Sequence, residues 1–385
     1  MKKSNILIGL SSILMCFTVF CFIFSLSIFT QPETAGINVQ GVTGKFKKMG
    51  ENIIDFITPE TENQKTRINN GTLVYIGGYP IGLKLYADGV IVVGTEAIDT
   101  DRGNINAAEN AGFKIGDLIK TVNGKTVNSN LFVSEIIAES AGEELSFGVM
   151  RNGEYLNINF KGEYSVSENK YKAGLWIRDS SAGIGTVTFC TQDGLFAALG
   201  HAVCDIDTKE TLPISRGECT DAKITGYIKG KVGTAGELCG YLETKKTGVI
   251  YSNRSIGVYG AFDDIPENCE LYPIALPEEV ETGHATIITT LENGEKETYN
   301  IKIEKIHHDD ENAKHLVIKV TDNTLLDKTG GIIQGMSGSP ILQNGKLVGA
   351  ITHVLVDDPT RGYGIFAQTM LEECLSAENI QDRAS

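Results

Sequence analysis

The stretch QGMSGSPILQNGKLVGAITH, residues 334–353, decides how this sequence is interpreted. It places Ser337 in a glycine-rich turn, follows that turn with Pro340, and reverses at Asn344-Gly345 between two apolar runs. An Asn-Gly pair between apolar runs is typical of a β-hairpin. The stretch therefore poses the question whether Ser337 is a nucleophile or only part of a tight turn.

The turn has the residues that a nucleophilic serine requires. A serine hydroxyl at its ordinary pKa reacts poorly, so it needs a nearby base and N–H donors for the oxyanion that forms. Gly335 can adopt a conformation that aims its N–H inward beside the N–H of Ser337, and Gly338 leaves room for a substrate carbonyl. The turn predicts Ser337 as the nucleophile, and Gly335 and Ser337 as the oxyanion hole.

The base has to be one of six histidines. His201, in ALGHAVCDIDT, follows a short run of small apolar residues and precedes acidic ones, as expected of a catalytic histidine at the end of a strand. The stretch HHDDENAKH, residues 307–315, suggests either a metal site or a solvated loop, and we favour the loop. His353 is expected to contact substrate or core, so His201 is the predicted general base.

The charge and the cysteine spacing of the sequence argue against binding of nucleic acid and of zinc. The formal net charge is −15 and the pI is about 4.9, and no large cluster of Lys and Arg interrupts this acidity. Because binding of nucleic acid requires such clusters, we expect no nucleic-acid partner. Of the eight cysteines, the six outside the N-terminal apolar run lack the paired spacing of a zinc site, which predicts no metal. The six cysteines outside the N-terminal apolar run permit disulfides without specifying any pairing.

The N-terminus is apolar and uncharged from residue 4 to residue 32. A helix over 6–29 would span roughly 36 Å, enough to cross a bilayer. Lys2 and Lys3 favour a cytoplasmic N-terminus, with the rest of the chain outside. We expect an uncleaved anchor over 1–30, with a cleaved signal peptide as the alternative. Residues 31–70 are expected to form a polar stalk.

Residues 71–163 resemble a PDZ domain of the type found in bacterial proteases. The resemblance rests on AGFKIGDLIKTVNG, residues 111–124, followed by a helical stretch near 131–142 and a hairpin around Asn152-Gly153. It implies that the stretch PIGLKL captures a peptide end, with Ile81, Gly82 and Leu83 as the binding residues, because PDZ domains add a peptide to a strand edge. The alternative is that the domain is only a spacer.

Residues 168–380 carry short β-rich runs separated by turns, with one helix expected over 367–377. GMSGSP resembles the nucleophile turn of chymotrypsin-like serine proteases, and residues 341–366 resemble the strands that follow it. The fold class implied is mainly β: an N-terminal transmembrane helix, a PDZ domain and a chymotrypsin-like double β-barrel peptidase domain.

Longer stretches resemble one family, the stage IV sporulation protein B peptidases of endospore-forming bacteria. They are IRDSSAGIGTVTF, ALGHAVCDIDT, DNTLLDKTGGIIQGMSGSPI and GAITHVLVDDPTRGYGI. The resemblance implies a secreted or membrane-tethered serine endopeptidase in the space between forespore and mother cell. It would cleave itself and a membrane-associated regulatory protein, which triggers pro-sigma-K processing by an intramembrane metalloprotease.

The family resemblance also implies that Asp322, in KVTDNTLLDKTGG, is the acidic member of the triad. This departs from the usual chymotrypsin order, although a triad is defined by geometry and not by order in the chain. Asp205 and Asp207 are rivals because they lie close to His201 in the sequence. The mechanism implied is acyl transfer without a cofactor. The alternative function is a catalytically silent scaffold whose PDZ domain binds the termini of membrane proteins.

Overall fold

The computed structural model describes residues 71–384, except 266, 268, 293, 311 and 312. Within that part of the chain no helix is both long and apolar enough to span a bilayer. The anchor predicted over 1–30 and the stalk predicted over 31–70 lie outside the described residues.

Six strands near the C-terminus close into a barrel. Around the barrel they are β17 (Gly283–Thr290), β18 (Lys296–Ile306), β19 (Leu316–Val320), β22 (Arg361–Phe366), β21 (Lys346–Val354) and β20 (Pro340–Gln343). Strand β18 shows why they form: Tyr299, Ile301 and Ile303 are buried while their neighbours are more exposed, because alternate residues of a strand face opposite sides.

A second set of strands pairs in a ring. The order is β2 (Pro80–Thr95), β11 (Leu175–Cys190), β12 (Leu195–Ala198), β15 (Gly257–Phe262), β14 (Glu237–Arg254) and β13 (Ile214–Ile228), and β13 returns to β2. Strands β1 (Leu73–Ile76) and β16 (Leu271–Pro273) extend the sheet beyond β11. We call this ring the first barrel, and the barrel of β17–β22 the second barrel.

A third body has its own core around Phe113, Phe147 and Phe160, whose rings meet edge to face. Its elements are β3 (Ile98–Thr100), β4 (Gly103–Ile105), α4 (Ala107–Ala111), β5 (Leu118–Val122), β6 (Lys125–Thr126), α5 (Asn130–Glu139), β7 (Glu144–Arg151), β8 (Glu154–Lys161), β9 (Glu163–Ser165) and β10 (Lys170–Lys172). The Ser129 hydroxyl caps α5 by accepting from the Phe132 N–H. This body corresponds to the predicted PDZ domain.

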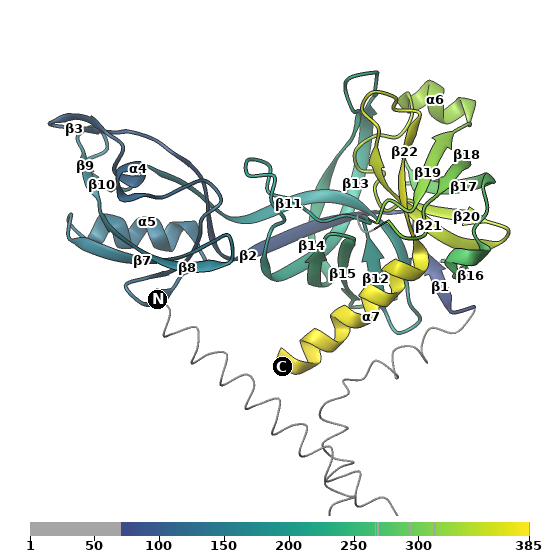
Figure 1. The fold of residues 1–385 in the computed structure, drawn as a ribbon, viewed down its shortest axis with the longest axis horizontal. Helices are drawn as coiled ribbons and strands as arrows, with labels where there is room; N and C mark the ends of the chain where they lie inside the picture. Colours follow the sequence, from purple (N-terminus) through teal and green to yellow (C-terminus); the bar gives the residue numbers. More distant parts are fainter. Residues whose placement is uncertain (1–70, 266, 268, 293, 311–312, 385) are drawn as a thin grey trace, which may run out of the picture. The chain divides into compact units, whose positions relative to one another are not determined.

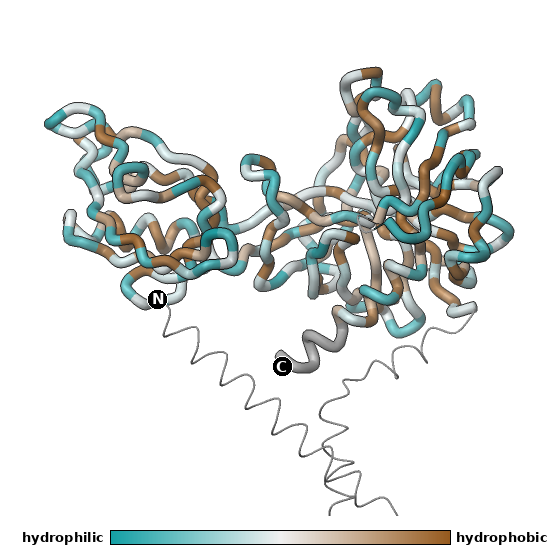
Figure 2. The backbone as a smooth tube through the Cα atoms, viewed as in Figure 1, coloured by the Kyte–Doolittle hydropathy of each residue, from teal (hydrophilic) through white to brown (hydrophobic). Residues whose placement is uncertain are grey.

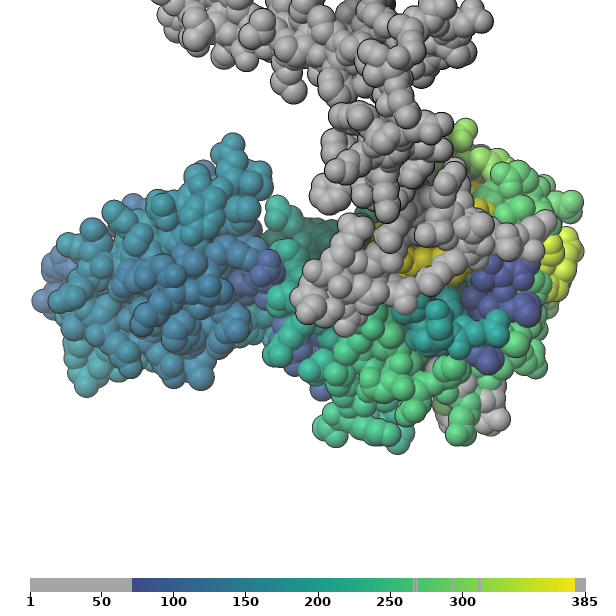
Figure 3. Space-filling view, turned by 90° about the horizontal axis from the view of Figure 1, so that it is seen from below, coloured from purple at the N-terminus to yellow at the C-terminus, as the bar shows by residue number. Residues whose placement is uncertain are grey.

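Two long strands are shared between the PDZ body and the first barrel (Figure 1). Residues 80–87 of β2 pair with β11 and β13 in the barrel, whereas Val90 and Ile91 pair with β5 in the PDZ body. The PDZ domain is therefore inserted between two strands of the barrel. The predicted boundary at residue 71 is wrong, because β1 and the first half of β2 belong to the peptidase part. In Figure 3 the purple atoms of these first described residues lie beside green atoms of much later segments.

The remaining helices cover the barrels. They are η1 (Pro277–Glu279), α6 (Asn323–Thr329) and α7 (Ala367–Ala384). Helix α7 begins at the predicted residue and buries Met370, Leu371 and Cys374 against apolar residues of β1, β12 and β21. Apolar segments, brown in Figure 2, gather inside both barrels and the PDZ body.

Candidate active site

Ser337 lies in a tight turn just before β20. Two glycines in the turn, Gly335 and Gly338, both have φ +94°, a conformation that side chains with a Cβ rarely adopt. The turn is closed by hydrogen bonds from the Ser339 N–H to the Met336 carbonyl, 2.9 Å, and from the Gly338 N–H to the Ile351 carbonyl, 2.7 Å. Because Met336 is fully buried, the core of the second barrel anchors the turn.

The first barrel also holds this turn. The hydroxyl of Thr186 on β11 donates to the Gly335 carbonyl at 2.7 Å, and that of Thr188 donates to the Gly338 carbonyl at 2.8 Å. Neither threonine was predicted as a site residue. Their alternation in GIGTVTF shows that they share one face of a strand, but not that the face meets residues about 150 positions later.

His201 follows β12 through two consecutive left-handed residues, Leu199 with φ +67° and Gly200 with φ +70°. These residues turn the chain sharply at the end of the strand and bring the imidazole to the gap between the barrels. Its Nδ1 lies 2.8 Å from the carbonyl oxygen of Ala202. If Nδ1 carries the proton and donates it to this carbonyl, then Nε2 is free to act as a base.

Partial burial lowers the pKa of His201, and the hydrogen bond to the Ala202 carbonyl opposes that shift only in part. A lowered pKa keeps the imidazole neutral at pH 7, which is the state that a general base requires.

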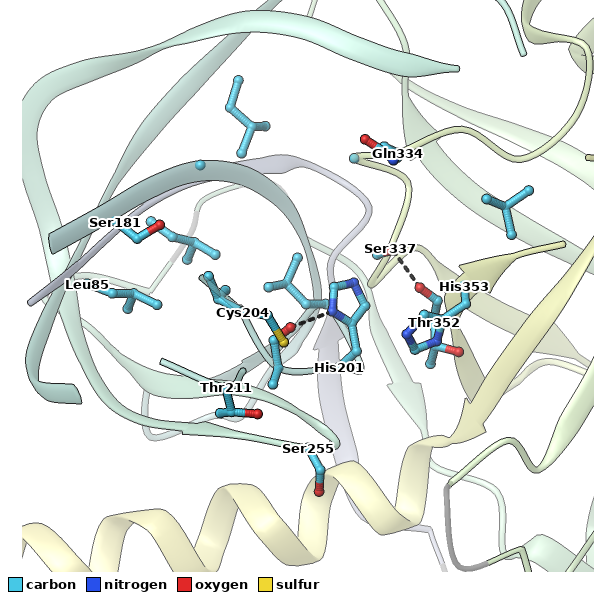
Figure 4. A pocket seen from close by; sticks show the side chains of 18 of the residues that line it. Leu85, Ser181, His201, Cys204, Thr211, Ser255, Gln334, Ser337, Thr352 and His353 are labelled. Carbon is cyan, nitrogen blue, oxygen red and sulfur yellow. Dashed lines mark hydrogen bonds between the residues drawn. The ribbon is translucent and has the colours of Figure 1, made fainter. Parts of the chain in front are cut away.

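His201 and Ser337 line one pocket of about 820 Å³ between the two barrels (Figure 4). The Ser337 hydroxyl donates to the Thr352 carbonyl at 2.6 Å, and no hydrogen bond joins it to His201 among the described residues. The ring of His353 lies 4.9 Å from that of His201. His353, which was expected to contact substrate or core, thus lines the pocket beside the predicted base His201.

The predicted oxyanion donors are available. Within the described chain, neither the Gly335 N–H nor the Ser337 N–H has a hydrogen-bond partner. Gly335 and Ser337 both line the pocket that contains His201. An oxyanion that forms next to Ser337 would therefore find two free donors, the arrangement that acyl transfer requires.

Asp322 does not orient His201 in the structure. Its carboxylate caps α6, where it accepts hydrogen bonds from the N–H groups of Thr324 and Leu325, and it also accepts from the N–H and side-chain amide of Asn300. It does not line the pocket of Ser337. The structure contradicts the prediction that Asp322 is the triad acid, because these donors hold its carboxylate at the start of α6.

Asp205 and Asp207, the alternative candidates for the triad acid, also form interactions with groups other than His201. Asp205 is buried and pairs with Arg178, and its carboxylate also accepts from the N–H groups of Asp207 and Thr208. Asp207 pairs with the same Arg178. The carbonyl of Ala202 is therefore the group that orients His201 among the described residues. A backbone carbonyl carries no residue-type signal, so the sequence could not reveal it.

The predicted PDZ ligand residues lie inside the first barrel. Ile81 and Leu83 are buried in its core, and the backbone from 81 to 83 pairs with β11 on one edge and with β13 on the other. A Cβ on Gly82 would overlap the Thr220 hydroxyl and lie 2.7 Å from Leu242 Cγ. The prediction that Ile81, Gly82 and Leu83 bind a peptide is wrong, because strand addition needs an unpaired edge.

The histidine-rich stretch HHDDENAKH is not wholly solvated. His315 is buried against Phe366, whose N–H donates to His315 Nδ1 at 3.3 Å. Its pKa is lowered by this burial. Across the described residues, no group of three or more His, Cys, Asp or Glu side chains is placed to hold a metal ion. Within the described residues, none of the six cysteines beyond the N-terminal apolar run forms a disulfide.

Two β-barrels that bring a serine and a histidine to one pocket are the arrangement of a serine peptidase. The chain belongs to the SpoIVB peptidase S55 family, which matches residues 169–371, more than half of its length. A PDZ domain matches residues 81–161. The protein is therefore a PDZ-containing serine peptidase.

The solved structures that match the chain are distant in sequence, and no curated protein matches it. The PDZ domain of an SdrC-like protein from Listeria monocytogenes is 16% identical over 23% of this chain and 87% of that chain, with a TM-score of 0.19. The active form of the Rv3671c protease from M. tuberculosis is 15% identical over 51% and 74% of the two chains, with a TM-score of 0.32. A serine endoprotease from Yersinia pestis is 12% identical over 50% and 58%, with a TM-score of 0.30.

Proposed function

We propose that this peptidase is a sporulation-signalling endopeptidase that cleaves itself and a membrane-associated regulatory protein. The cleavage takes place between the forespore and mother-cell membranes and triggers pro-sigma-K processing by an intramembrane protease. The observation that carries the peptidase role is the pocket that Ser337 and His201 share. Family membership supports the role in sporulation. The two rings of strands support a chymotrypsin-like double barrel.

The proposed reaction begins when the Ser337 hydroxyl leaves the Thr352 carbonyl and turns toward His201. Its proton passes to Nε2 while the oxygen attacks the peptide carbonyl, and the oxyanion accepts from the N–H groups of Gly335 and Ser337. The imidazolium then protonates the leaving amine. Water, deprotonated by the same imidazole, hydrolyses the acyl-enzyme and restores the Ser337 hydroxyl.

We also propose that a helix over 6–29 tethers the peptidase to a membrane. Its length and the flanking Lys2 and Lys3 support a single crossing with the catalytic part outside the cytoplasm. Self-cleavage within residues 31–70 would release the peptidase from that anchor.

Peptide recognition by the PDZ domain belongs to a different groove from the one expected. Helix α5 and residues 170–177 line a pocket of about 290 Å³. Residues 175–178 of β11 pair with β2 on one edge, and within the described chain no strand pairs with the other edge. That open edge beside a helix is what a peptide needs to add as a strand. We call this site the α5 groove.

Blocking the α5 groove is expected to weaken cleavage of protein substrates. Ala138 lines the groove, so Ala138→Glu adds bulk and a negative charge where a peptide carboxylate would lie. We expect at least a tenfold fall in the rate of self-cleavage, about 1.4 kcal/mol of lost binding. Hydrolysis of a short peptide that contacts only the Ser337 pocket should be unchanged.

Glu139→Gln, on the neighbouring position of α5 outside the groove lining, is the matched control. Self-cleavage at the wild-type rate in Ala138→Glu would show that the α5 groove does not recognise substrate. Equal losses on both substrates would mean that the substitution disturbs the fold.

The proposed function is tested by incubating the full-length chain with and without a fluorophosphonate, which reacts with activated serines. The untreated protein should shorten itself, and the fragments mapped by mass should identify cuts between residues 31 and 70. The treated protein should stay intact and carry the adduct on Ser337. A chain that neither shortens nor takes up the adduct would support the alternative, a silent scaffold that binds the termini of membrane proteins.

A further inference from the structure

Strands β13 and β14 form a long hairpin whose end reaches the second barrel. The two strands remain paired from Gly217↔Ile250 out to Ile228↔Glu237. Beyond them, the Gly230 N–H donates to the Thr329 carbonyl at 2.8 Å, and the Gly233 N–H donates to the Val356 carbonyl at 2.9 Å. A hairpin of the first barrel therefore contacts the end of α6 and the segment after β21 in the second barrel. We call its end, residues 226–240, the hairpin arm.

The hairpin arm pairs with the residue that precedes the oxyanion glycine. The Gln334 N–H donates to the Gly236 carbonyl, and the Leu238 N–H donates to the Gln334 carbonyl, both at 2.8 Å. These two bonds form an isolated parallel bridge between Glu237 and Gln334. Gln334 itself is exposed, so its side chain does not fix this part of the backbone.

The second of these bonds controls the direction of an oxyanion donor. The Gln334 carbonyl and the Gly335 N–H belong to one peptide unit, which is planar and trans, so they point in opposite directions. When Leu238 holds the carbonyl on the side of the hairpin arm, the Gly335 N–H must point the other way. Glycine at φ +94° imposes little restraint of its own, because it moves between backbone conformations more freely than other residues.

We propose that Leu238 is a positioning residue for the oxyanion hole, and that its backbone N–H keeps the Gly335 N–H aimed into the pocket. The Leu238 side chain packs on the same glycine, where a Cβ at position 335 would lie 2.9 Å from Leu238 Cβ. Thr186 holds the next carbonyl, that of Gly335. The two peptide units that flank Gly335 are thus fixed by two strands of the first barrel.

This inference rests on the proposed role of Ser337 and Gly335 in acyl transfer. It assigns a catalytic purpose to a contact that packing alone does not require, because the Ser337 turn is already anchored by Met336 and Ile351. Loss of one oxyanion donor lowers kcat by about 10²–10³. Without the hydrogen bond from Leu238, the peptide unit between residues 334 and 335 can flip, which turns the Gly335 N–H out of the pocket. The resulting fall in kcat should approach the same range.

The test compares variants of the full-length chain on quenched fluorescent casein. Leu238→Pro removes the N–H, whereas Leu238→Ala keeps it and shortens the side chain. We expect Leu238→Pro to lower kcat by about 10²-fold with KM within about threefold, and Leu238→Ala to lower kcat by less than about tenfold. Val232→Ala, at the exposed end of the hairpin arm, is the control and should match wild type.

A backbone ester at position 238, made by incorporating the α-hydroxy acid of leucine, removes the N–H without the ring of proline. It keeps the test decisive if Leu238→Pro fails to fold. Wild-type kcat in the ester variant would overturn the inference while leaving the peptidase assignment intact. Wild-type protein that leaves casein uncut and takes up no fluorophosphonate would instead overturn the proposed function.

Discussion

Replacing Ser337 by Ala, His201 by Ala, or both together is expected to lower kcat by about 10⁶-fold in every case. The three losses should be nearly equal because, in the proposed mechanism, Ser337 loses its proton only to His201 and every later proton transfer by His201 depends on the attack of Ser337. The two residues come from different barrels and meet only in the shared pocket. Rates of casein cleavage, with unfolding midpoints to show that each variant is folded, check this result.

The control for the proposed catalytic dyad of Ser337 and His201 is Asp322→Ala. Because Asp322 caps α6 and does not reach His201, we expect kcat to stay within about threefold while the free energy of unfolding falls by about 1 kcal/mol, a typical value for a lost cap. Desolvation by itself raises the pKa of Asp322. The hydrogen bonds from Asn300, Leu325 and Thr324 together lower this pKa by more, so the net shift is downward. Its stabilising contribution should be present above the unfolded pKa and lost as the pH falls.

Two outcomes would contradict this account of the dyad. A kcat for His201→Ala near that of wild type would remove His201 as the base. A fall of about 10⁴-fold in kcat for Asp322→Ala, similar to losing the orienting acid of a triad, would restore Asp322 to the triad and imply a rearrangement of α6 in the active enzyme.

Gly338→Ala is expected to destroy the nucleophile turn. A Cβ at this position would overlap the Thr186 carbonyl oxygen and lie 2.6 Å from the Leu199 nitrogen, and the backbone has φ +94°. Both neighbours are backbone atoms, Thr186 in β11 and Leu199 in the turn that leads to His201, so neither can move aside without displacing that strand or that turn. We expect a loss of about 3–5 kcal/mol in the free energy of unfolding and no measurable cleavage.

Gly345→Ala separates this clash from backbone strain. Gly345 has φ +74°, but nothing lies within 4 Å of a Cβ built on it. Only the cost of a left-handed alanine, about 1 kcal/mol, should appear, and kcat should be unchanged. Urea unfolding of both variants measures the difference. Equal losses would mean that the approach of Thr186 to Gly338 has no energetic importance.

The sequence alone determined the local features of this protein. The glycines around Ser337 predicted a turn, the short β-rich runs over 168–380 predicted strands, and the pattern over 367–377 predicted a helix. Each of these patterns acts through nearby residues. The PDZ domain was recognised for the same reason, because its turn and its helix are contiguous in the chain. His201 at the end of a strand was also a local signal.

Only the tertiary structure shows which strand edges pair and which backbone groups contact the residues of the candidate site. Residues 81–83 and 175–178 are both strand segments, and only long-range pairing shows that the first pairs on both edges and the second on one. Asp322 was predicted to orient His201, but its carboxylate accepts hydrogen bonds from N–H groups at the start of α6 instead. The contacts of Ala202 and Leu238 involve backbone atoms, which every residue type shares, so no pattern of side chains could have predicted them.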